Sequence, residues 1–209
     1  MRSSKNSMSR TGHLTPALLG VAFVAIGATA VAAPMTYQID PSHTFPSFEV
    51  DHTGGTSVWR GKFNTTSGTV TMDKAAGTGT VSVTIDAGSI DFGHEGLNNH
   101  VTGKDRPDPA MLDVAKFPTA TYEGRLTSWV NGAPTKVEGN LTLHGVTKPV
   151  NLEIRSFKCA PARQGGGETC GADAYAEFNR ADFGVSFGQS FGFTMGVTLR
   201  IQIEAGSAP

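Results

Sequence analysis

The stretch VEGNLTLHGVTKPVNLEIR, residues 137–155, alternates apolar and polar side chains on both sides of a turn. Apolar residues or glycine take every second position before the turn (137–143) and again after it (150–154). A period of two is the side-chain period of a strand that buries one face. The connecting residues HGVTKP carry the glycine and proline typical of a turn. The stretch therefore predicts two antiparallel strands joined by a hairpin.

The same alternation recurs along the chain, at residues 48–52, 81–85 and 195–204, while helical periodicity is almost absent. Further strand-like segments lie at 59–64, 68–72, 120–128 and 172–178. The chain has 209 residues, of which 38% are hydrophobic and 17% charged, which is typical of one globular domain and excludes a disordered chain. About eight to ten short strands joined mostly by turns predict an all-β barrel or sandwich.

One segment, residues 88–118, breaks the rhythm of strands and turns. Asp108 and Pro109 have the residue types of a helix N-cap and first position, and Pro118 prevents continuation. We therefore expect a short helix over residues 110–116. So long an insertion in a tight meander is more typical of a functional cap over the barrel than of a plain crossover.

Residues 1–32 have the composition of a secretory signal peptide. Three basic residues lie within the first ten positions, an apolar run occupies 14–26, and small residues close the segment at 30–32. An uncleaved membrane anchor is the alternative, but Pro16 inside the run and the A-x-A site favour cleavage. The expected organisation is a signal peptide over 1–32 and one domain over 33–209, with no stable membrane insertion after cleavage.

The charge distribution excludes nucleic acid as a partner. The full chain has 17 basic and 18 acidic residues, a net charge of −1. Because Arg2, Lys5 and Arg10 lie in the signal segment, the remaining chain has 14 basic against 18 acidic residues, a net charge of −4. Nucleic-acid binding requires clustered lysine and arginine, whereas the two signs are interspersed along this chain.

The two cysteines, Cys159 and Cys170, both lie in the part of the chain that is predicted to be exported. Outside the cytoplasm such a pair is typical of a disulfide. In the chain-entropy description, closing so short a loop stabilises the fold by about 2–3 kcal/mol. The residues between the cysteines include no histidine and no third cysteine, which argues against a metal site there.

No catalytic constellation emerges from the motifs. Residues 188–192, GQSFG, match the G-x-S-x-G pattern, but neither an aspartate nor a histidine follows Ser190, so an acyl-hydrolase triad is excluded. His94 and His100, with Asp91 and Glu95, carry groups that suit zinc, but their spacing matches no closed metal site. We therefore expect no enzyme activity and no metal.

Seven segments, taken in order, resemble the YceI-like family of bacterial exported proteins. They are 37–43 (YQIDPSH), 48–52 (FEVDH), 61–63 (GKF), 89–91 (SID), 112–118 (LDVAKFP), 139–150 (GNLTLHGVTKPV) and 179–184 (NRADFG). The resemblance spans essentially all of residues 33–209, and its most specific part is LHGVTKP at 143–149. The segment FGHEGLNNH at 92–100 departs from the pattern of many members, which leaves the identity of a ligand's headgroup open.

The resemblance implies an antiparallel, lipocalin-like β-barrel of about eight strands with a short helical cap insertion. It further implies a periplasmic protein whose apolar tunnel holds polyisoprenoid or other long-chain lipids. No catalytic residues and no cofactor come with the family; its partner is a hydrophobic small molecule. The oligomeric state stays open, with a homodimer as one arrangement.

The candidate ligand-binding residues are those with inward parity on the predicted strands and those in the cap. On the strands they are Phe48, Val50, His52, Trp59, Phe63, Val83, Ile85, Tyr122, Leu141, Leu143, Val197 and Leu199. In the cap they are Leu97, Asn98, His100, Leu112 and Phe117. Asn98, His100 and His52 are assigned to the polar end of the tunnel.

A cluster of phenylalanines precedes the last predicted strand. Of the 12 phenylalanines, five lie in a glycine-rich segment: Phe178, Phe183, Phe187, Phe191 and Phe193. We predict that they form an apolar mouth beside the cavity, with Phe183, Phe187 and Phe191 as ligand contacts.

The expected function is that of an exported, non-enzymatic binding protein. It would hold a polyprenyl, quinone-like or fatty amphiphilic lipid for carriage, storage or stress protection. The alternatives are a metal-binding or enzymatic barrel that uses the cap histidines, and a structural or partner-binding β-module with a filled core.

Overall fold

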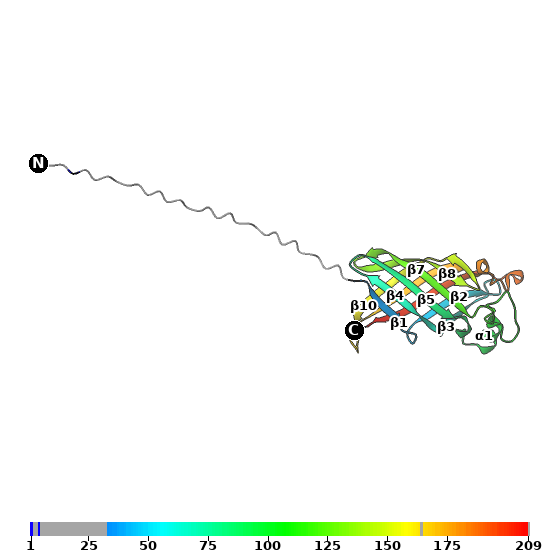
Figure 1. Cartoon of the computed structure of the whole chain (residues 1–209). Coiled ribbons are helices and arrows are strands. Elements are labelled where there is room, and N and C mark those ends of the chain that lie inside the picture. The colour runs from blue at the N-terminus through cyan, green and yellow to red at the C-terminus, as the bar shows by residue number, and fades with distance from the viewer. Residues whose placement is uncertain (2–3, 5–32, 164, 209) are drawn as a thin grey trace. The chain divides into compact units, whose positions relative to one another are not determined.

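The computed structural model describes Met1, Ser4, residues 33–163 and residues 165–208. The predicted signal peptide lies outside this range apart from two isolated positions, so it stays a prediction. Strands dominate the described chain (Figure 1). They are β1 (Met35–Ile39), β2 (Phe45–His52), β3 (Ser57–Phe63), β4 (Thr66–Asp73), β5 (Thr78–Asp86), β6 (Ile90–Asp91), β7 (Thr119–Val130), β8 (Ala133–Leu143), β9 (Val146–Pro149), β10 (Leu152–Pro161), β11 (Glu168–Asn179) and β12 (Gly196–Ser207).

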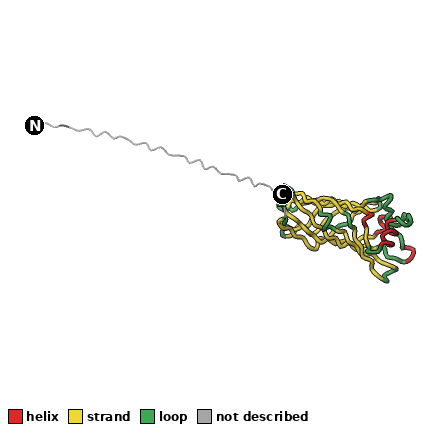
Figure 2. Tube along the Cα trace, turned by 90° about the horizontal axis from the view of Figure 1, so that it is seen from below, coloured by secondary structure: helices red, strands yellow, loops and turns green. Residues whose placement is uncertain are grey.

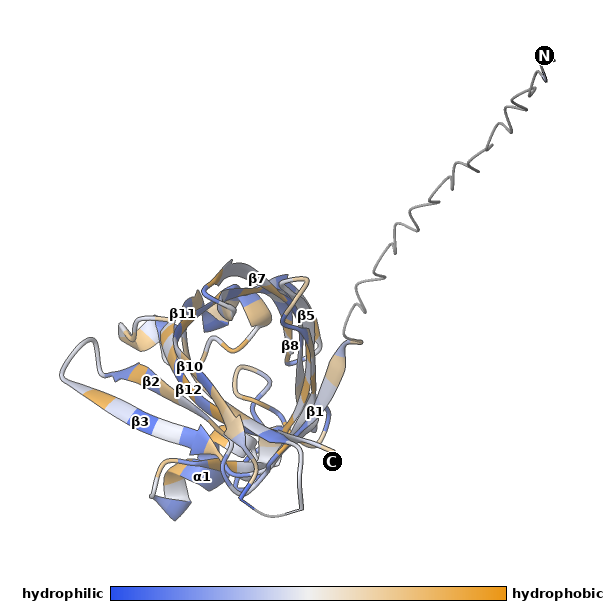
Figure 3. Ribbon diagram, turned by 90° about the vertical axis from the view of Figure 1, so that its left-hand side faces the viewer, coloured by the Kyte–Doolittle hydropathy of each residue, from blue (hydrophilic) through white to orange (hydrophobic). Residues whose placement is uncertain are grey.

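The strands close into an eight-stranded antiparallel barrel in the order β1-β4-β5-β7-β8-β10-β11-β12. Pairing of β1 with the end of β12, Tyr37 opposite Ser207 and Ile39 opposite Ala205, completes the ring. Figure 3 looks along the barrel and shows this ring, with β2 and β3 diverging from it. The predicted all-β, lipocalin-like barrel is confirmed.

The hairpin predicted at residues 137–155 forms, but its turn is shorter than the predicted six residues HGVTKP. Only His144 and Gly145 make the turn, and Val146–Pro149 is the strand β9. His144 and Gly145 adopt φ values of 52° and 76°, the left-handed pair of a tight two-residue turn. The strand after the turn is β9, which pairs with the second half of β8, while β10 pairs with its first half. β8 thus pairs with two successive strands, β9 and β10, on the same edge.

A similar division occurs at β12. Its second half pairs with β1 and its first half with β2. The hairpin of β2 and β3 extends the sheet beyond the ring, and β6 pairs with the end of β3. The barrel wall is therefore incomplete at this end, where the helical segments gather (Figure 2). We call it the cap end, and the opposite end, where β12 finishes, the disulfide end.

The cap contains one α-helix, but not where the sequence predicts it. Helix α1 spans Glu95–Thr102, capped by His94, whose Nδ1 accepts a hydrogen bond from the Leu97 N–H. Gly103, with φ of 79°, ends it. The prediction of a helix over residues 110–116 is wrong. The N–H groups of Leu112 and Val114 donate to carbonyls at the end of α1 instead of to their own segment.

The backbone conformation within residues 110–116 is a second reason that no helix forms there. Asp113 adopts φ of 45°, a left-handed conformation that interrupts a right-handed helix. Asp108 does cap locally, because its Oδ1 accepts from the Ala110 N–H at 2.9 Å. Hydrogen-bonded turns follow at residues 108–111 and 113–117 instead of a helix, so the N-cap and proline signal was correct for a turn and misleading for a helix.

Candidate functional site

The barrel encloses an elongated cavity of about 430 Å³. Its wall is made by the inward-facing residues of the long strands and is almost entirely apolar. Small side chains leave part of this space open, because Ala172 and Ala174 of β11 line it. An enclosed apolar volume of this size suits one hydrophobic small molecule.

The structure places most of the predicted binding residues on the cavity wall. These are Phe48, Val50, His52, Trp59, Phe63, Val83, Ile85, Leu97, His100, Leu112, Tyr122, Leu141, Leu143, Phe187, Val197 and Leu199. Those on strands lie there because alternate residues of a strand face the interior, whereas Leu97, His100, Leu112 and Phe187 reach the wall from outside the strands. Their contact with a ligand stays a prediction.

Two predicted phenylalanines of the mouth do not line the cavity. Phe183 is 1% exposed and packs edge-on against Phe178, with ring centroids 5.3 Å apart, so it fills the core behind the wall. Phe191 is 72% exposed on a short 3₁₀ turn, Gln189–Phe191, and points away from the apolar interior. The spacing of phenylalanine with glycine did not distinguish these positions from Phe187 and Phe193, which do line the cavity.

Two predicted cap residues also lie off the wall. Asn98 holds the cap together, because its Oδ1 accepts from the Phe92 N–H and its Nδ2 donates to Asp91. Phe117 stacks on the imidazole of His144 with centroids 4.2 Å apart. Both side chains are therefore occupied by structural contacts within the fold.

Aromatic rings concentrate where the cavity reaches the cap end. Trp59 lies edge-on to His52 and Phe92 at centroid distances of 5.9 and 6.2 Å, and Phe193 contacts His52 from the other side at 5.7 Å. His100 packs edge-on against Phe187 at 5.1 Å. Phe92 also lines the cavity, but it was not among the predicted binding residues. It belongs to the segment 92–100, which was noted only because it differs from many family members and which has no periodic pattern.

The polar groups of the wall are few, and four of them lie toward the cap end: Asp51, His52, His100 and Arg180. Arg180 was missed by the sequence reasoning, which treated residues 179–184 only as a family signature. Burial lowers the pKa of its guanidinium, which stays charged at neutral pH.

The residues considered as metal ligands do not converge. His94 caps α1, and Asp91 accepts hydrogen bonds from Asn98 and the Gly93 N–H. Within the described part of the chain, three potential ligand atoms come together only at Cys159, Glu168 and Cys170. The two sulfurs there are joined to each other, so the predicted disulfide Cys159–Cys170 is confirmed.

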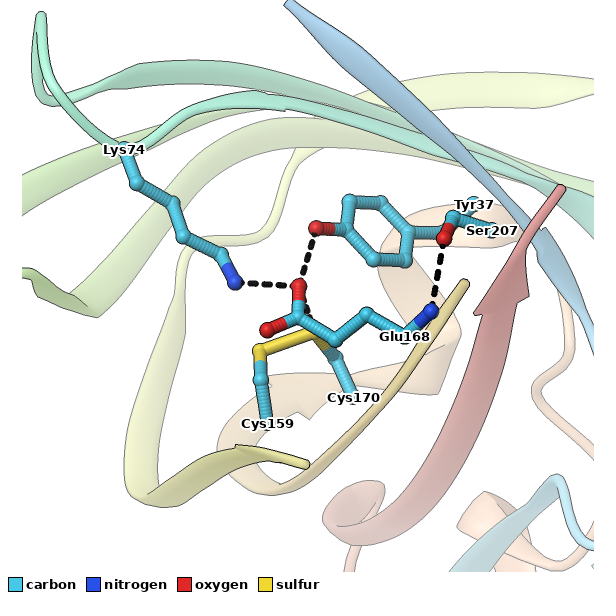
Figure 4. The surroundings of a disulfide bond; sticks show 6 residues. All are labelled: Tyr37, Lys74, Cys159, Glu168, Cys170 and Ser207. Carbon is cyan, nitrogen blue, oxygen red and sulfur yellow. Dashed lines mark hydrogen bonds and ion pairs between the residues drawn. A yellow bond between two sulfur atoms is a disulfide. The ribbon is translucent and has the colours of Figure 1, made fainter. Parts of the chain in front are cut away.

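The disulfide bridges opposite positions of β10 and β11 and lies beside a polar cluster (Figure 4). Glu168 Oε2 accepts from the Tyr37 hydroxyl at 2.6 Å and from Lys74 Nζ at 2.5 Å. These contacts join β1, the β4–β5 turn and β11. Tyr37 and Cys170 also line the cavity, whereas Glu168 and Lys74, which form an ion pair, are not among its lining residues.

This cluster predicts a specific loss of stability in acid. The hydrogen bond from Lys74, followed by that from Tyr37, holds the pKa of Glu168 below its ordinary value of 4.5. A carboxyl whose pKa is lowered by folding stabilises the protein above its unfolded-state pKa and loses that effect as the pH falls through its folded-state pKa. We expect Glu168→Gln to reduce the free energy of unfolding by about 1–2 kcal/mol at pH 7.

The measurement is urea unfolding of both proteins between pH 7 and pH 2.5. The difference between them should shrink as the pH falls below 4.5. Glu153→Gln, at a mostly exposed carboxylate, serves as control. A difference that is constant over this range would show that Glu168 acts through packing rather than charge.

Comparison with known proteins agrees with this geometry. The YceI-like domain model matches residues 37–205. A UPF0312 protein of Yersinia pestis (strain Pestoides F) is 35% identical over 177 residues, which cover 81% of this chain and 86% of that protein. The crystal structure of Burkholderia cenocepacia BcnA is similar with a TM-score of 0.60 and 23% identity, covering 80% of this chain and 99% of BcnA.

A polyisoprenoid binding domain from Saccharophagus degradans is also similar in structure. Its TM-score is 0.57 at 16% identity, over 84% of this chain and 99% of that domain. Both solved structures support the barrel fold described above.

Proposed function

The chain belongs to the YceI-like family, and on this premise we propose that it is an exported binding protein that holds a long-chain isoprenoid or fatty lipid inside its barrel. The observation that carries the proposal is the enclosed apolar cavity of about 430 Å³. The structurally similar domain of Saccharophagus degradans is described as polyisoprenoid binding, which supports the same class of ligand here.

The energetics of such a cavity favour a hydrocarbon chain. Burying one isoprene unit of five carbons contributes about 3–4 kcal/mol at about 0.8 kcal/mol per carbon. Several units together offset an association cost of roughly 4–15 kcal/mol. Micromolar affinity, about −8 kcal/mol, therefore requires no charged contact, and a wall already closed by strand pairing keeps the ordering cost low.

The alternatives account less well for the geometry. A structural β-module would have a filled core, because an empty apolar cavity lowers the stability of the fold. The elongated cavity of this barrel therefore disfavours that alternative. For an enzymatic or metal-binding barrel, the cap groups Asp91, His94 and His100 would have to face one another, whereas His94 and Asp91 make capping hydrogen bonds. Proteins of this family are generally binding proteins rather than enzymes.

Export to the periplasm is part of the proposal. The disulfide Cys159–Cys170 suits an oxidising compartment, and the composition of residues 1–32 is that of a signal peptide. Among the helices that the structure describes, none has the length and apolar character needed to cross a bilayer.

The direct test is native mass spectrometry of the protein purified from its own host, followed by organic extraction. We expect an adduct that disappears on extraction and is identified as a long-chain lipid. Protein that arrives empty and fails to bind a panel of polyprenols, quinones and fatty acids would contradict the proposal.

Two phenylalanines of the cap provide a matched pair of variants. Phe187 lines the cavity, whereas Phe191 is 72% exposed and does not. We expect Phe187→Ser to weaken lipid affinity about tenfold, because the apolar surface that the ring buries against the lipid is lost. Phe191→Ser should leave the affinity nearly unchanged. Displacement of a fluorescent fatty acid measures both. Equal losses of affinity in the two variants would show that the lipid does not contact Phe187 in the cavity.

A further inference from the structure

Arg180 is an unusual residue to find in the wall of an apolar cavity. It begins the 3₁₀ turn Arg180–Phe183 that follows β11, and its side chain lines the cavity at the cap end. Nη1 donates to the Val185 carbonyl and Nη2 to the Phe187 carbonyl, both at 2.8 Å. A guanidinium has five N–H donors, so these two bonds leave it with unused donors.

No carboxylate neutralises this charge directly. Within the described residues, Arg180 makes no ion pair within 4.0 Å. The carboxylate of Asp51 interacts with it only through the longer-range electrostatic attraction between the two charges. Both oxygens of Asp51 are already engaged: Oδ1 accepts from the Gly55 N–H at 2.6 Å and Oδ2 from the Thr194 N–H at 2.8 Å. A partly buried cation with unused donors is costly unless an acceptor completes it.

Two imidazoles share this end of the wall. The Nδ1 atom of His52 lies 3.3 Å from the Thr53 hydroxyl, and that of His100 lies 3.7 Å from Asp105. Their Nε2 atoms have no hydrogen-bond partner among the described residues. The cap end of the cavity therefore combines the cation of Arg180 with two imidazoles that can donate a hydrogen bond. The carboxylate of Asp51 also lies there, with both of its oxygens occupied by backbone N–H groups.

The opposite end of the cavity has no unpaired cation on its wall. Tyr37 lines the cavity there and donates its hydroxyl to Glu168, whose carboxylate is paired with Lys74. Among the described residues that line the cavity, Arg180 is the one lysine or arginine, so an anionic headgroup finds its counter-charge at the cap end.

We propose that Arg180, with His52 and His100 on the wall of the same cavity, forms a headgroup site, and that the lipid it takes ends in an oxyanion, either a carboxylate or a phosphate. The inference rests on the proposed lipid-binding function and deepens it. The hydrocarbon chain extends from Arg180 toward the disulfide end. A planar guanidinium matches the paired oxygens of either anion, and the low dielectric of the cavity strengthens the contact.

The test uses three ligands that share one isoprenoid chain: geranylgeranyl phosphate, geranylgeranoic acid and geranylgeraniol. Isothermal titration of delipidated full-length protein gives the ratio of each acid's affinity to that of the alcohol. We expect a ratio of at least about tenfold for one or both acids. Which acid binds more tightly distinguishes a phosphate from a carboxylate as the preferred headgroup.

Arg180→Gln should reduce this ratio toward one, and Arg180→Lys should retain part of it. Arg180 also holds the loop that carries Phe187, so a purely structural role would weaken all three ligands by the same factor and leave the ratio unchanged. Arg155→Gln, on the outer face where the guanidinium stacks on Tyr175, is the matched control and should keep the wild-type ratio.

The outcomes separate the two proposals. Equal binding of acid and alcohol by the wild-type protein, or an unchanged ratio in Arg180→Gln, overturns the headgroup site while lipid binding stands. The wild-type ratio needs no variant, so a folding defect at Arg180 does not obscure it. Failure of all three ligands to bind overturns the lipid-binding function itself, and the headgroup site with it.

Discussion

Replacing Ala174 by phenylalanine will reduce lipid affinity by about a hundredfold or more. Ala174 lies in the middle of β11, opposite Ile201 on β12 and opposite Ile154 on β10, and all three line the cavity. A benzyl side chain at this point occupies the space that the hydrocarbon would fill. A hundredfold change corresponds to about 2.8 kcal/mol, less than the burial of one isoprene unit.

The fold should tolerate this change. Filling an apolar cavity adds buried contacts and removes empty volume, so the melting temperature of the lipid-free variant should equal or exceed that of the lipid-free wild type. Thermal unfolding by circular dichroism, with titration of a fluorescent fatty acid, separates the two effects.

The matched control for Ala174→Phe is its neighbour. Asp173 is exposed on the outer face of β11, so Asp173→Phe introduces the same ring outside the barrel and should leave affinity unchanged. Full affinity in Ala174→Phe would show that the lipid does not enter the barrel.

Breaking the disulfide has the second largest expected effect, this time on stability. Cys159 and Cys170 face each other across β10 and β11 and close a loop with a sequence separation of 11. Its loss should lower the free energy of unfolding by about 2–3 kcal/mol, which corresponds to roughly 4–12 °C in melting temperature for a domain of this size. The effect should exceed that of Glu168→Gln.

The measurement compares urea unfolding of the oxidised protein with that of the protein reduced by a phosphine. The double variant Cys159→Ala/Cys170→Ala is the control, because the reductant has no bond to break in it. Because Cys170 Sγ lies 3.7 Å from Glu168 Oε2, combining Glu168→Gln with reduction should give less than the sum of the two effects. Equal stability of oxidised and reduced protein would contradict the prediction.

The sequence predicted the strands better than the cap. Alternation of apolar and polar residues is a local property, and it identified the inward faces of β5, β8 and β12 correctly. The cap lacks such a period. Asp108 and Pro109 carried a local helix signal, yet the N–H groups of Leu112 and Val114 found partners on α1, and this competition between distant segments cannot be read from either one alone.

The same limit applies to the candidate site. Inward parity placed residues such as Val83 and Leu199 on the wall, because in a barrel parity and facing direction coincide. Phe183, Phe187 and Phe191 share a glycine-rich segment without a period, and only their tertiary contacts separate a core ring, a wall ring and an exposed ring. Arg180 carried no periodic signal and emerged only from the cavity.

By itself, then, the sequence determined the all-β class, the hairpin at 137–155, the inward face of the main strands and the pairing of the two cysteines. Only the tertiary structure decided that the inward faces enclose a cavity instead of a filled core. That outcome depends on β1 closing onto β12, with Tyr37 opposite Ser207, and on Ala172 and Ala174 of β11, whose small side chains leave space inside the ring. Closure joins residues far apart in the chain, so no local pattern encodes it.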